Sequence, residues 1–143
     1  MILSAIENSD DHISAEEMLK KARAKSFNGN IDYICTDVTN IPLDSCIFDV
    51  VVCYSSFPHF QDKPRALAEL KRVIKSGGKL LICHTSSRNE IKEFHYQIPL
   101  VKNDIIPDGD EMRLMLSAAG FTEIKVEDKS DSYLASAIKP GLE

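Results

Sequence analysis

The sequence predicts an α/β fold built on an open sheet, mostly parallel and with an antiparallel edge at its C-terminal end. Residues 48–84 support this most strongly, because they show the pattern of a strand, a loop, an amphipathic helix, a glycine turn and a second strand. Two strands joined through a helix form the crossover unit of a parallel sheet. Residues 121–127 and 133–138 alternate in polarity around a polar turn at 128–131, which is typical of an antiparallel pair.

The N-terminal part of the chain predicts a strand, a helix and a second strand. Residues 1–7 are a short apolar strand candidate, and residues 31–35 are another. Between them, Ser14 and Glu17 form a capping-box pattern at the start of an amphipathic helix that extends to about Lys25. The predicted order of elements therefore begins with a strand, a helix and a strand.

The central unit is marked by signals at the ends of its elements. Residues 48–53 are almost continuously apolar, as expected for a strand that is covered on both faces. Asp62 is placed to cap the next helix, and Pro64 is tolerated in its first turn. The glycine pair at 77–78 predicts the end of this helix, where a positive φ is needed, and 79–83 predicts the following strand.

The C-terminal part predicts two more helices before the antiparallel pair. Residues 87–96 are a candidate short helix, and 97–107 are a candidate loop with two prolines. Asp108 and Glu111 repeat the capping pattern ahead of a helix that is stopped by Gly120. We therefore expect this helix to lead directly into the first strand of the pair.

The composition is that of an ordinary folded domain. The 143 residues are 43% hydrophobic and 27% charged, so we expect one domain over 1–143 with its own core. The net charge is -5 and the basic residues are scattered, so we expect no nucleic-acid partner. The longest apolar runs are only as long as strands, so we expect no membrane span, and the N-terminus does not resemble a signal peptide.

Cysteine usage predicts a cytoplasmic protein. Four cysteines occur, Cys35, Cys46, Cys53 and Cys83, and none of them forms a CxxC motif. Most of them lie in or beside apolar, strand-like segments. This pattern favours buried, reduced thiols over disulfides.

The expected ligand-binding edge of the sheet is polar. In open α/β sheets, ligands bind beyond the carboxyl ends of the strands. The residues expected at these ends are Glu7, Asp10, Asp11, Asp37, residues 53–56 and residues 84–86. Their acidic and hydroxyl groups suit a ligand with amines and hydroxyls better than a phosphate, although ordinary polar residues at loop starts would give the same pattern.

Several segments in series resemble the class I S-adenosylmethionine-dependent methyltransferases, in the branch with type 11 and ubiquinone/menaquinone-type enzymes. The similar segments are 12–25 (HISAEEMLKKARAK), 31–44 (IDYICTDVTNIPLD), 48–84, 117–128 and 132–140. The resemblance implies a Rossmann-like sheet and S-adenosylmethionine as the cofactor. It also implies methyl transfer to a small-molecule acceptor.

The same resemblance implies roles for individual residues. Asp37 would accept a hydrogen bond from the adenine amino group, and the backbone N–H of Val38 would donate one to the cofactor. Asp11 is the best match to the acidic residue that binds the ribose hydroxyls. The residues expected to line the methionine part of the cofactor are Cys53, Tyr54 and Ser55.

Two histidines are candidates for a general base, which helps when the acceptor must lose a proton. His84 ends a predicted strand, and His59 matches the histidine of the family. Each also has a structural interpretation, as a hydrogen-bonded residue at the sheet edge and as a loop residue, and His95 is expected on a helix surface. Cys83 and His84 are adjacent and point to opposite faces of a strand, so we expect no metal site.

The sequence departs from the family at its N-terminal end. The family's VLDxGxGxG strand and loop have no counterpart, because no glycine precedes Gly29 and no GxG occurs. That loop lets the backbone approach the cofactor where a side chain would block it. We therefore expect a domain truncated at the N-terminus, with its central slot filled by residues 1–7, by a second copy or by a complementing chain.

Three functions remain open at this point. The first is methyl transfer, weak or absent in the isolated chain. The second is a role as a non-catalytic partner, or as half of a split methyltransferase that is completed by another chain or by homo-oligomerisation. The third is an unrelated small α/β ligand-binding domain.

Overall fold

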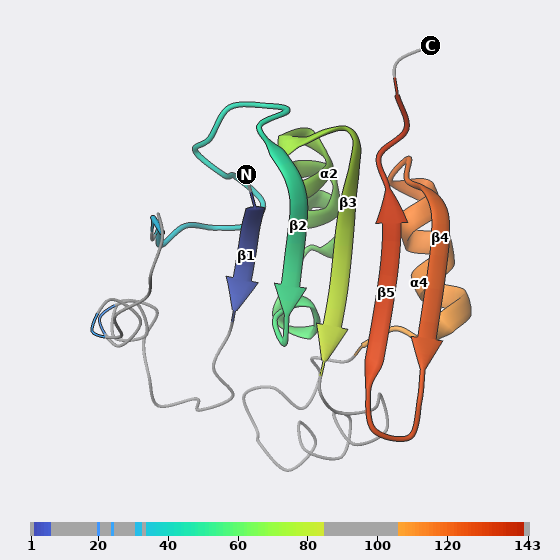
Figure 1. The fold of residues 1–143 in the computed structure, drawn as a ribbon. Coiled ribbons are helices and arrows are strands. Elements are labelled where there is room, and N and C mark those ends of the chain that lie inside the picture. The colour runs from blue at the N-terminus through green and yellow to red at the C-terminus, as the bar shows by residue number, and fades with distance from the viewer. Residues whose placement is uncertain are drawn as a thin grey trace.

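A mixed sheet of five strands organises the described part of the chain (Figure 1). The computed structural model describes residues 2–6, 20, 24, 31–32, 34–84 and 106–141. The strands are β1 (Ile2–Ile6), β2 (Phe48–Tyr54), β3 (Ile74–His84), β4 (Thr122–Asp128) and β5 (Tyr133–Ile138), in the order β1-β2-β3-β5-β4. Strands β1 to β3 are parallel, and β5 is antiparallel to both β3 and β4. The predicted open sheet with an antiparallel C-terminal edge is confirmed.

Strand β1 lies directly beside β2. The two strands pair in parallel from Ile2 opposite Val50 to Ile6 opposite Tyr54. The N-terminal segment therefore occupies the position next to β2, which is one of the three arrangements expected from the sequence. Strand β1 is an edge strand of the described sheet, and β2 is its neighbour.

The predicted second strand at 31–35 is wrong. Residues 31, 32, 34 and 35 lie outside the sheet, and the side chains of Ile31 and Ile34 are 47% and 44% exposed. Strand propensity depends on the packing that a segment finds, and it is not a property of the backbone alone. Both edges of β2 are paired, with β1 and with β3, and none of the described strands pairs with residues 31, 32, 34 or 35.

Helix α2 (Lys63–Val73) follows β2 through a short 3-10 turn, η1 (Phe57–His59). The carboxylate of Asp62 accepts a hydrogen bond from the backbone N–H of Arg65 at 3.1 Å, which confirms the predicted cap. Pro64 lies in the first turn, as expected. The residues on the buried side of the helix are Ala66, Leu67, Leu70 and Val73.

The glycine pair 77–78 lies inside β3, so the prediction that it ends the preceding helix is wrong. Helix α2 ends at Val73, and the chain enters the sheet at the next residue. The pairing of β2 with β3 shifts register between Phe48 and Val50, and Gly77 adopts a φ of 81° within the irregular stretch. The positive φ was expected for this glycine pair, but Gly77 adopts it in a β-bulge of β3, where the pairing with β2 shifts register.

Helix α4 (Gly109–Ala118) precedes β4, as predicted. The carboxylate of Asp108 accepts from the backbone N–H of Glu111 at 2.9 Å, so the cap is confirmed. Gly120 has a φ of 91° where the chain turns from this helix into β4. The predicted helix at 87–96 and most of the loop at 97–107 lie outside the described residues. Of the predicted helix at 14–25, the structure describes Lys20 and Ala24, which are helical and exposed.

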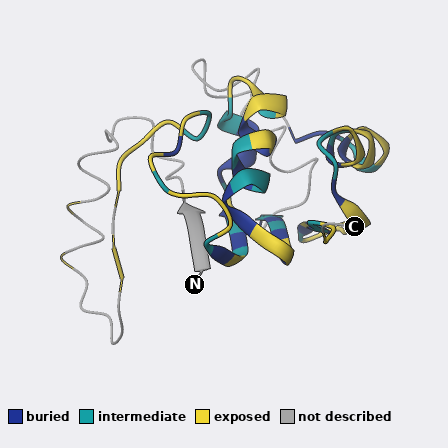
Figure 2. Ribbon diagram, turned by 90° about the horizontal axis from the view of Figure 1, so that it is seen from above, coloured by how far each residue is buried: buried dark blue, intermediate teal, exposed yellow. Residues whose placement is uncertain are grey.

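Both described helices lie on the same side of the sheet, as the views from the front and from above agree (Figures 1 and 2). The face under the helices, here called the covered face, carries Val51, Cys53, Leu80, Ile82, Ala135 and Ala137, all 0–1% exposed. The opposite face, here called the open face, carries Val50, Val52, Tyr54, Lys79, Leu81, Cys83, Leu134, Ser136 and Ile138, flanked by Lys125 and Glu127 of β4. These side chains are half-buried or exposed. No described helix is long and apolar enough to span a membrane.

Candidate functional site

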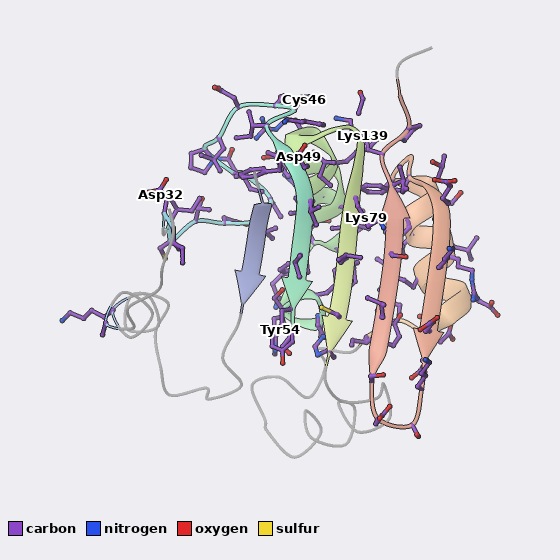
Figure 3. The ribbon with its side chains drawn as sticks, viewed as in Figure 1. Asp32, Cys46, Asp49, Tyr54, Lys79 and Lys139 are labelled. Carbon is purple, nitrogen blue, oxygen red and sulfur yellow. The ribbon has the colours of Figure 1, made fainter. Side chains whose placement is uncertain are left out.

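The carboxyl ends of β2 and β3 meet at one edge of the sheet, here called the rim (Tyr54, Ser55, Cys83 and His84). Tyr54 pairs with Cys83, and the backbone N–H of Ser55 donates to the carbonyl of Cys83 at 2.9 Å. Figure 3 shows Tyr54 at this end of β2, far from the labelled Cys46 and Lys139 at the opposite end. Because ligands bind beyond the carboxyl ends of parallel strands, the rim is the candidate site.

Ser55 adopts a strained backbone at the rim. Its φ is 54°, in the left-handed region, although it is not glycine. Such a residue costs roughly 1–3 kcal/mol and persists only where the surrounding structure holds it in place. Here the hydrogen bond to Cys83 and the nearly complete burial of Ser56, at 3% exposed, hold the turn. Strain of this kind is common at functional sites, but Cys46 (φ 59°) and Glu123 (φ 48°) share it away from the rim, so the place of Ser55 at the carboxyl end of β2 carries the argument.

The turn after the rim is rigid. Lys63 donates from its ammonium group to the carbonyls of Pro58 at 3.2 Å and Phe60 at 3.0 Å. The same ammonium lies 5.9 Å from the centre of the Phe57 ring. Phe57 and Phe60 pack edge to face with 5.5 Å between ring centres. The half-buried His59, the last residue of η1, is therefore carried on a well-fixed backbone.

His84 lies against a buried wall at the end of β3. Its side chain is 8% exposed, and it pairs in register with the fully buried Tyr133 of β5. The phenolic O–H of Tyr133 donates to the backbone carbonyl of Pro107 at 2.9 Å. Tyr133 thus joins the end of the last strand to the segment before α4. Sequence reasoning missed Tyr133, because its partner is 26 residues away and no local pattern indicates the contact.

The cysteines differ in their surroundings. Cys53 is fully buried on the covered face, and this burial, with the nearby thiol of Cys83, raises its pKa to about 12. Its side chain therefore offers a ligand no surface, and Tyr54 and Ser55 are the exposed part of this loop. Burial also raises the pKa of the half-buried Cys83. Cys35 and Cys46 are exposed, so the prediction of buried thiols is wrong for both.

Asp37 forms a turn with its own loop. Its Oδ1 accepts from the backbone N–H of Thr39 at 2.9 Å and from the Thr39 hydroxyl at 2.7 Å. These two hydrogen bonds hold the pKa of the exposed Asp37 carboxyl below its usual value. Both bonds use Oδ1, so Oδ2 keeps its capacity to accept from a ligand. Val38, which follows, is half-buried.

Helix α2 holds the loop that carries Asp37. The guanidinium of Arg65 donates to the carbonyl of Thr39 at 3.4 Å. The carboxylate of Glu69 accepts from the backbone N–H of Ile41 at 2.8 Å, and Arg72 donates to the carbonyl of Ile41 at 2.9 Å. Glu69 and Arg72 also pair at 2.8 Å, and this contact lowers the pKa of Glu69. The described contacts of Asp37 thus lead to the helix and not to the rim.

The structure brings some of the predicted site residues together. Cys53, Tyr54, Ser55 and His59 follow one another through the rim and η1, and His84 ends the neighbouring strand. Asp37 and Val38 belong to the separate loop on α2. Asp11 and His95 lie outside the described residues, and no described group of three or more His, Cys, Asp or Glu side chains could hold a metal ion.

The described glycines do not form a cofactor cradle at the rim. Gly77 and Gly78 pair with Lys139 at the amino end of the sheet, where Gly77 N–H donates to the Lys139 carbonyl at 2.8 Å. Gly109 is the first residue of α4, and Gly120 follows this helix. The described rim therefore offers a strained hydroxyl-bearing turn and an exposed tyrosine ring. It does not include the bare glycine backbone that approaches a cofactor in glycine-loop sites.

A comparison with protein families and curated proteins places these elements in a known context. Residues 13–82 match a family described as a methyltransferase domain. This range includes the Asp37 loop, Tyr54 and Ser55 of the rim, and helix α2. The ubiquinone/menaquinone biosynthesis C-methyltransferase UbiE of Idiomarina loihiensis is 26% identical over 138 residues, covering 80% of this chain and 55% of the relative. The corresponding enzyme of Pseudoalteromonas translucida is 28% identical over 145 residues, covering 82% and 58%. The chain thus spans little more than half the length of these relatives.

Solved structures share the fold. A putative S-adenosylmethionine-dependent methyltransferase from Methanococcus maripaludis superposes with a TM-score of 0.66 at 23% identity, covering 90% of this chain and 63% of that chain. A putative methyltransferase from Haloferax volcanii, solved in complex with a methyltransferase activator, gives a TM-score of 0.68 at 18% identity, covering 87% and 68%. At these identities the likeness concerns the fold alone.

Proposed function

We propose that the chain belongs to the class I S-adenosylmethionine-dependent methyltransferases, and that its rim takes part in methyl transfer to a small-molecule acceptor; the match of residues 13–82 to a methyltransferase domain and the likeness to the curated relatives support this. The observation that carries this proposal is the strained Ser55 beside the exposed Tyr54, at the carboxyl ends of two paired parallel strands. Strain costs stability, so its presence where ligands bind in such sheets favours a ligand-binding role.

The residues fit S-adenosylmethionine in part. The cofactor supplies an electrophilic methyl group on a sulfonium. Tyr54 and Ser55 would line its methionine part, and the ionised Asp37, with Oδ2 able to accept, would meet its adenine amino group beside Val38. Asp11 would bind the ribose hydroxyls. These residues would contact the cofactor from two separate loops, and the described residues include no glycine-rich loop for it.

The acceptor would bind at the rim with its nucleophile near His84 or His59. Methyl transfer depends mainly on approach geometry and on the exclusion of water. His84, at 8% exposure and in register with Tyr133, points to the covered face, opposite to Tyr54 and Cys83, so as a base it would act on an acceptor that reaches around the end of β3. His59, on the rigid η1 turn, is the alternative base.

A quinone-related ring is the finer proposal for the acceptor, with methylation at carbon. Its support is that the two relatives are ubiquinone/menaquinone C-methyltransferases. The rim suits an uncharged ring. Its accessible side chains are the exposed Tyr54 ring and the half-buried Cys83 thiol, and the raised pKa of Cys83 keeps this thiol neutral.

Calorimetry with S-adenosylmethionine and with its demethylated product tests the cofactor proposal. We expect micromolar binding that weakens at least tenfold in Asp37→Asn, which keeps the shape of the residue and removes its charge. Asp44→Asn is the matched control, because Asp44 is an exposed carboxylate in the same loop. No binding to the chain at millimolar cofactor would overturn the proposal for the isolated chain and would support a role beside a second chain. The Haloferax methyltransferase, solved with an activator, is a precedent for such an assembly.

A further inference from the structure

Side chains of helix α2 hold the Asp37 loop along its length. We propose that Glu69 and Arg72 are positioning residues, which set the selectivity of this loop for a base that carries a 6-amino group. This role rests on the proposed function, in which Asp37 meets the adenine amino group. It goes further, because Glu69 and Arg72 lie outside the proposed cofactor contacts and would act through Asp37.

Every second residue of the loop gives a polar group to a side chain of α2, and these loop residues are Thr39, Ile41, Leu43 and Ser45. Their partners on the helix are Arg65, Glu69 and Arg72. These three are spaced four and three residues apart, so they share one face of the helix. The loop is therefore seated along one face of α2, and not at a single point.

Each of the five N–H donors of the Arg72 guanidinium has an acceptor. Arg72 donates to the carbonyls of Ile41 and Leu43, each at 2.9 Å, and to the hydroxyl of Ser45 at 3.1 Å. It also donates twice to the carboxylate of Glu69, at 2.8 and 3.1 Å. The guanidinium is a rigid planar fork, so these bonds fix the directions of their acceptors. A lysine, with three donors on one nitrogen, cannot reproduce the set.

Ile41 is held by both of its backbone polar groups. Its N–H donates to Oε2 of Glu69 at 2.8 Å, and its carbonyl accepts from Arg72. Its side chain is 6% exposed and belongs to the core. Between Ile41 and Asp37 the chain forms a turn, in which the N–H of Asn40 donates to the Asp37 carbonyl at 3.0 Å. The position of Ile41 therefore determines where Asp37 lies.

The loop and the helix run in the same direction. Thr39 meets Arg65 in the first turn of α2, and Ser45 meets Arg72 in the last turn. Asp37 precedes Thr39, so it lies toward the amino end of the helix, and Arg65 is close enough for its charge to act on the Asp37 carboxylate. This end of α2 follows η1 and the rim. Helix α2 thus ties the Asp37 loop to the rim and sets the spacing between the two parts of the proposed cofactor site.

The direction of the Asp37 carboxylate decides which base it accepts. Oδ1 is engaged by the N–H and the hydroxyl of Thr39, whereas Oδ2 keeps its capacity to accept from a ligand. A 6-amino group can donate to Oδ2, but a 6-carbonyl would place oxygen against oxygen. Hydrogen bonds weaken steeply when their angles change. A shift of the loop should therefore reduce the preference for the amino group.

Calorimetry on the whole chain tests the proposal with two compounds, S-adenosylhomocysteine and its inosine counterpart, in which a carbonyl replaces the 6-amino group. We expect the wild type to bind the adenine compound at least about tenfold more tightly. Arg72→Lys, which keeps the charge, and Glu69→Ala should each reduce this preference at least about threefold, because each releases Ile41. Both compounds bind the same folded fraction, so a loss of stability alone leaves the ratio of their dissociation constants unchanged.

A double variant tests whether Arg72 acts through Asp37. Asp37→Asn should lose the preference, because its amide can present either an oxygen or an NH₂ group to the base. Adding Arg72→Lys to Asp37→Asn should then have no further effect on the ratio. A further loss in the double variant would show that Arg72 acts by another route and would overturn the proposal.

Two variants on α4 serve as controls. Arg113→Lys is matched to Arg72→Lys, because Arg113 also forms an ion pair three residues away, with Asp110 at 3.2 Å, but this pair lies within α4. Leu116→Val, at a fully buried leucine, lowers stability without touching the helix that holds the loop. Both controls should keep the preference of the wild type.

The outcomes separate this role from the proposed function. A wild type that binds neither compound overturns the proposed function of the isolated chain, and the positioning role with it. A wild type that binds both compounds equally leaves cofactor binding standing and overturns the positioning role. A preference that survives Arg72→Lys and Glu69→Ala, or that Leu116→Val reduces as strongly, also overturns the positioning role alone.

Discussion

The two faces of the sheet differ far more than their residues do. Val51 and Leu80 on the covered face are 0% and 1% exposed, whereas their chain neighbours Val52 and Leu81 on the open face are half-buried. The difference comes from topology. Helix α2, between the parallel strands β2 and β3, and helix α4, between β3 and β4, both pack on the covered face, and no described helix lies over the open face. Adjacent identical side chains therefore acquire different energetic and functional roles.

The largest expected effect separates the adjacent leucines. Leu80→Ala should lower the free energy of unfolding by about 2–5 kcal/mol, because it leaves a cavity under the helices. Leu81→Ala on the open face should cost about 1 kcal/mol or less, since its site is half-solvated. Urea denaturation of both variants measures these losses. Equal losses would show that the open face is packed as tightly as the covered one.

A smaller effect separates two tyrosines. Tyr133→Phe removes the hydroxyl that donates to the buried carbonyl of Pro107, and should cost about 1–3 kcal/mol. Tyr54→Phe, at the exposed rim, should change stability by no more than about 0.5 kcal/mol. Thermal unfolding of the two variants compares them directly. If Tyr54→Phe proved as costly as Tyr133→Phe, the rim tyrosine would be structural and the proposal for ligand binding would lose its support.

The smallest effect concerns the loop that α2 holds on the covered side. Arg72 and the Ile41 N–H lower the pKa of Glu69, so its carboxylate stabilises the folded chain above its ordinary pKa of 4.5. That contribution disappears as the pH falls through the lowered value. Glu69→Gln should therefore cost about 1 kcal/mol near neutral pH and nothing in stronger acid. Urea denaturation of the wild type and of Glu69→Gln, at neutral pH and at a pH below the lowered pKa of Glu69, measures this difference in the free energy of unfolding. A loss of stability that does not change with pH would mean that packing, not charge, holds the loop. Glu123→Gln, at an exposed glutamate, serves as the control.

Local signals in the sequence were sufficient for α2 and α4. Asp62 and Asp108 cap α2 and α4 as expected, because a cap involves only residues within one turn. The glycine pair at 77–78 was misplaced, because the bulge it forms depends on the register of β3 with β2, which lies far away in the chain. Its positive φ was predictable, but the element that needed it was not.

The candidate site was predictable in outline only. The rim follows from the rule that parallel strands present their carboxyl ends together, so Tyr54, Ser55 and His84 were identified from strand ends alone. The strain at Ser55 and the contact of Tyr133 with Pro107 required the structure, because both depend on how separate segments meet. Asp37 was identified by resemblance, and its turn with Thr39 and its attachment to α2 appear only in three dimensions.

By itself the sequence determined the fold class, the β2–α2–β3 unit and the relation to methyltransferases, because periodicity, caps and motifs are encoded by near neighbours. The tertiary structure decided which strand lies beside β2, why residues 31–35 stay outside the sheet, and which face the helices cover. These outcomes depend on which distant segments pair with β2 and on where α2 and α4 pack, which no local segment contains. The different burial of Leu80 and Leu81 is a result of that packing.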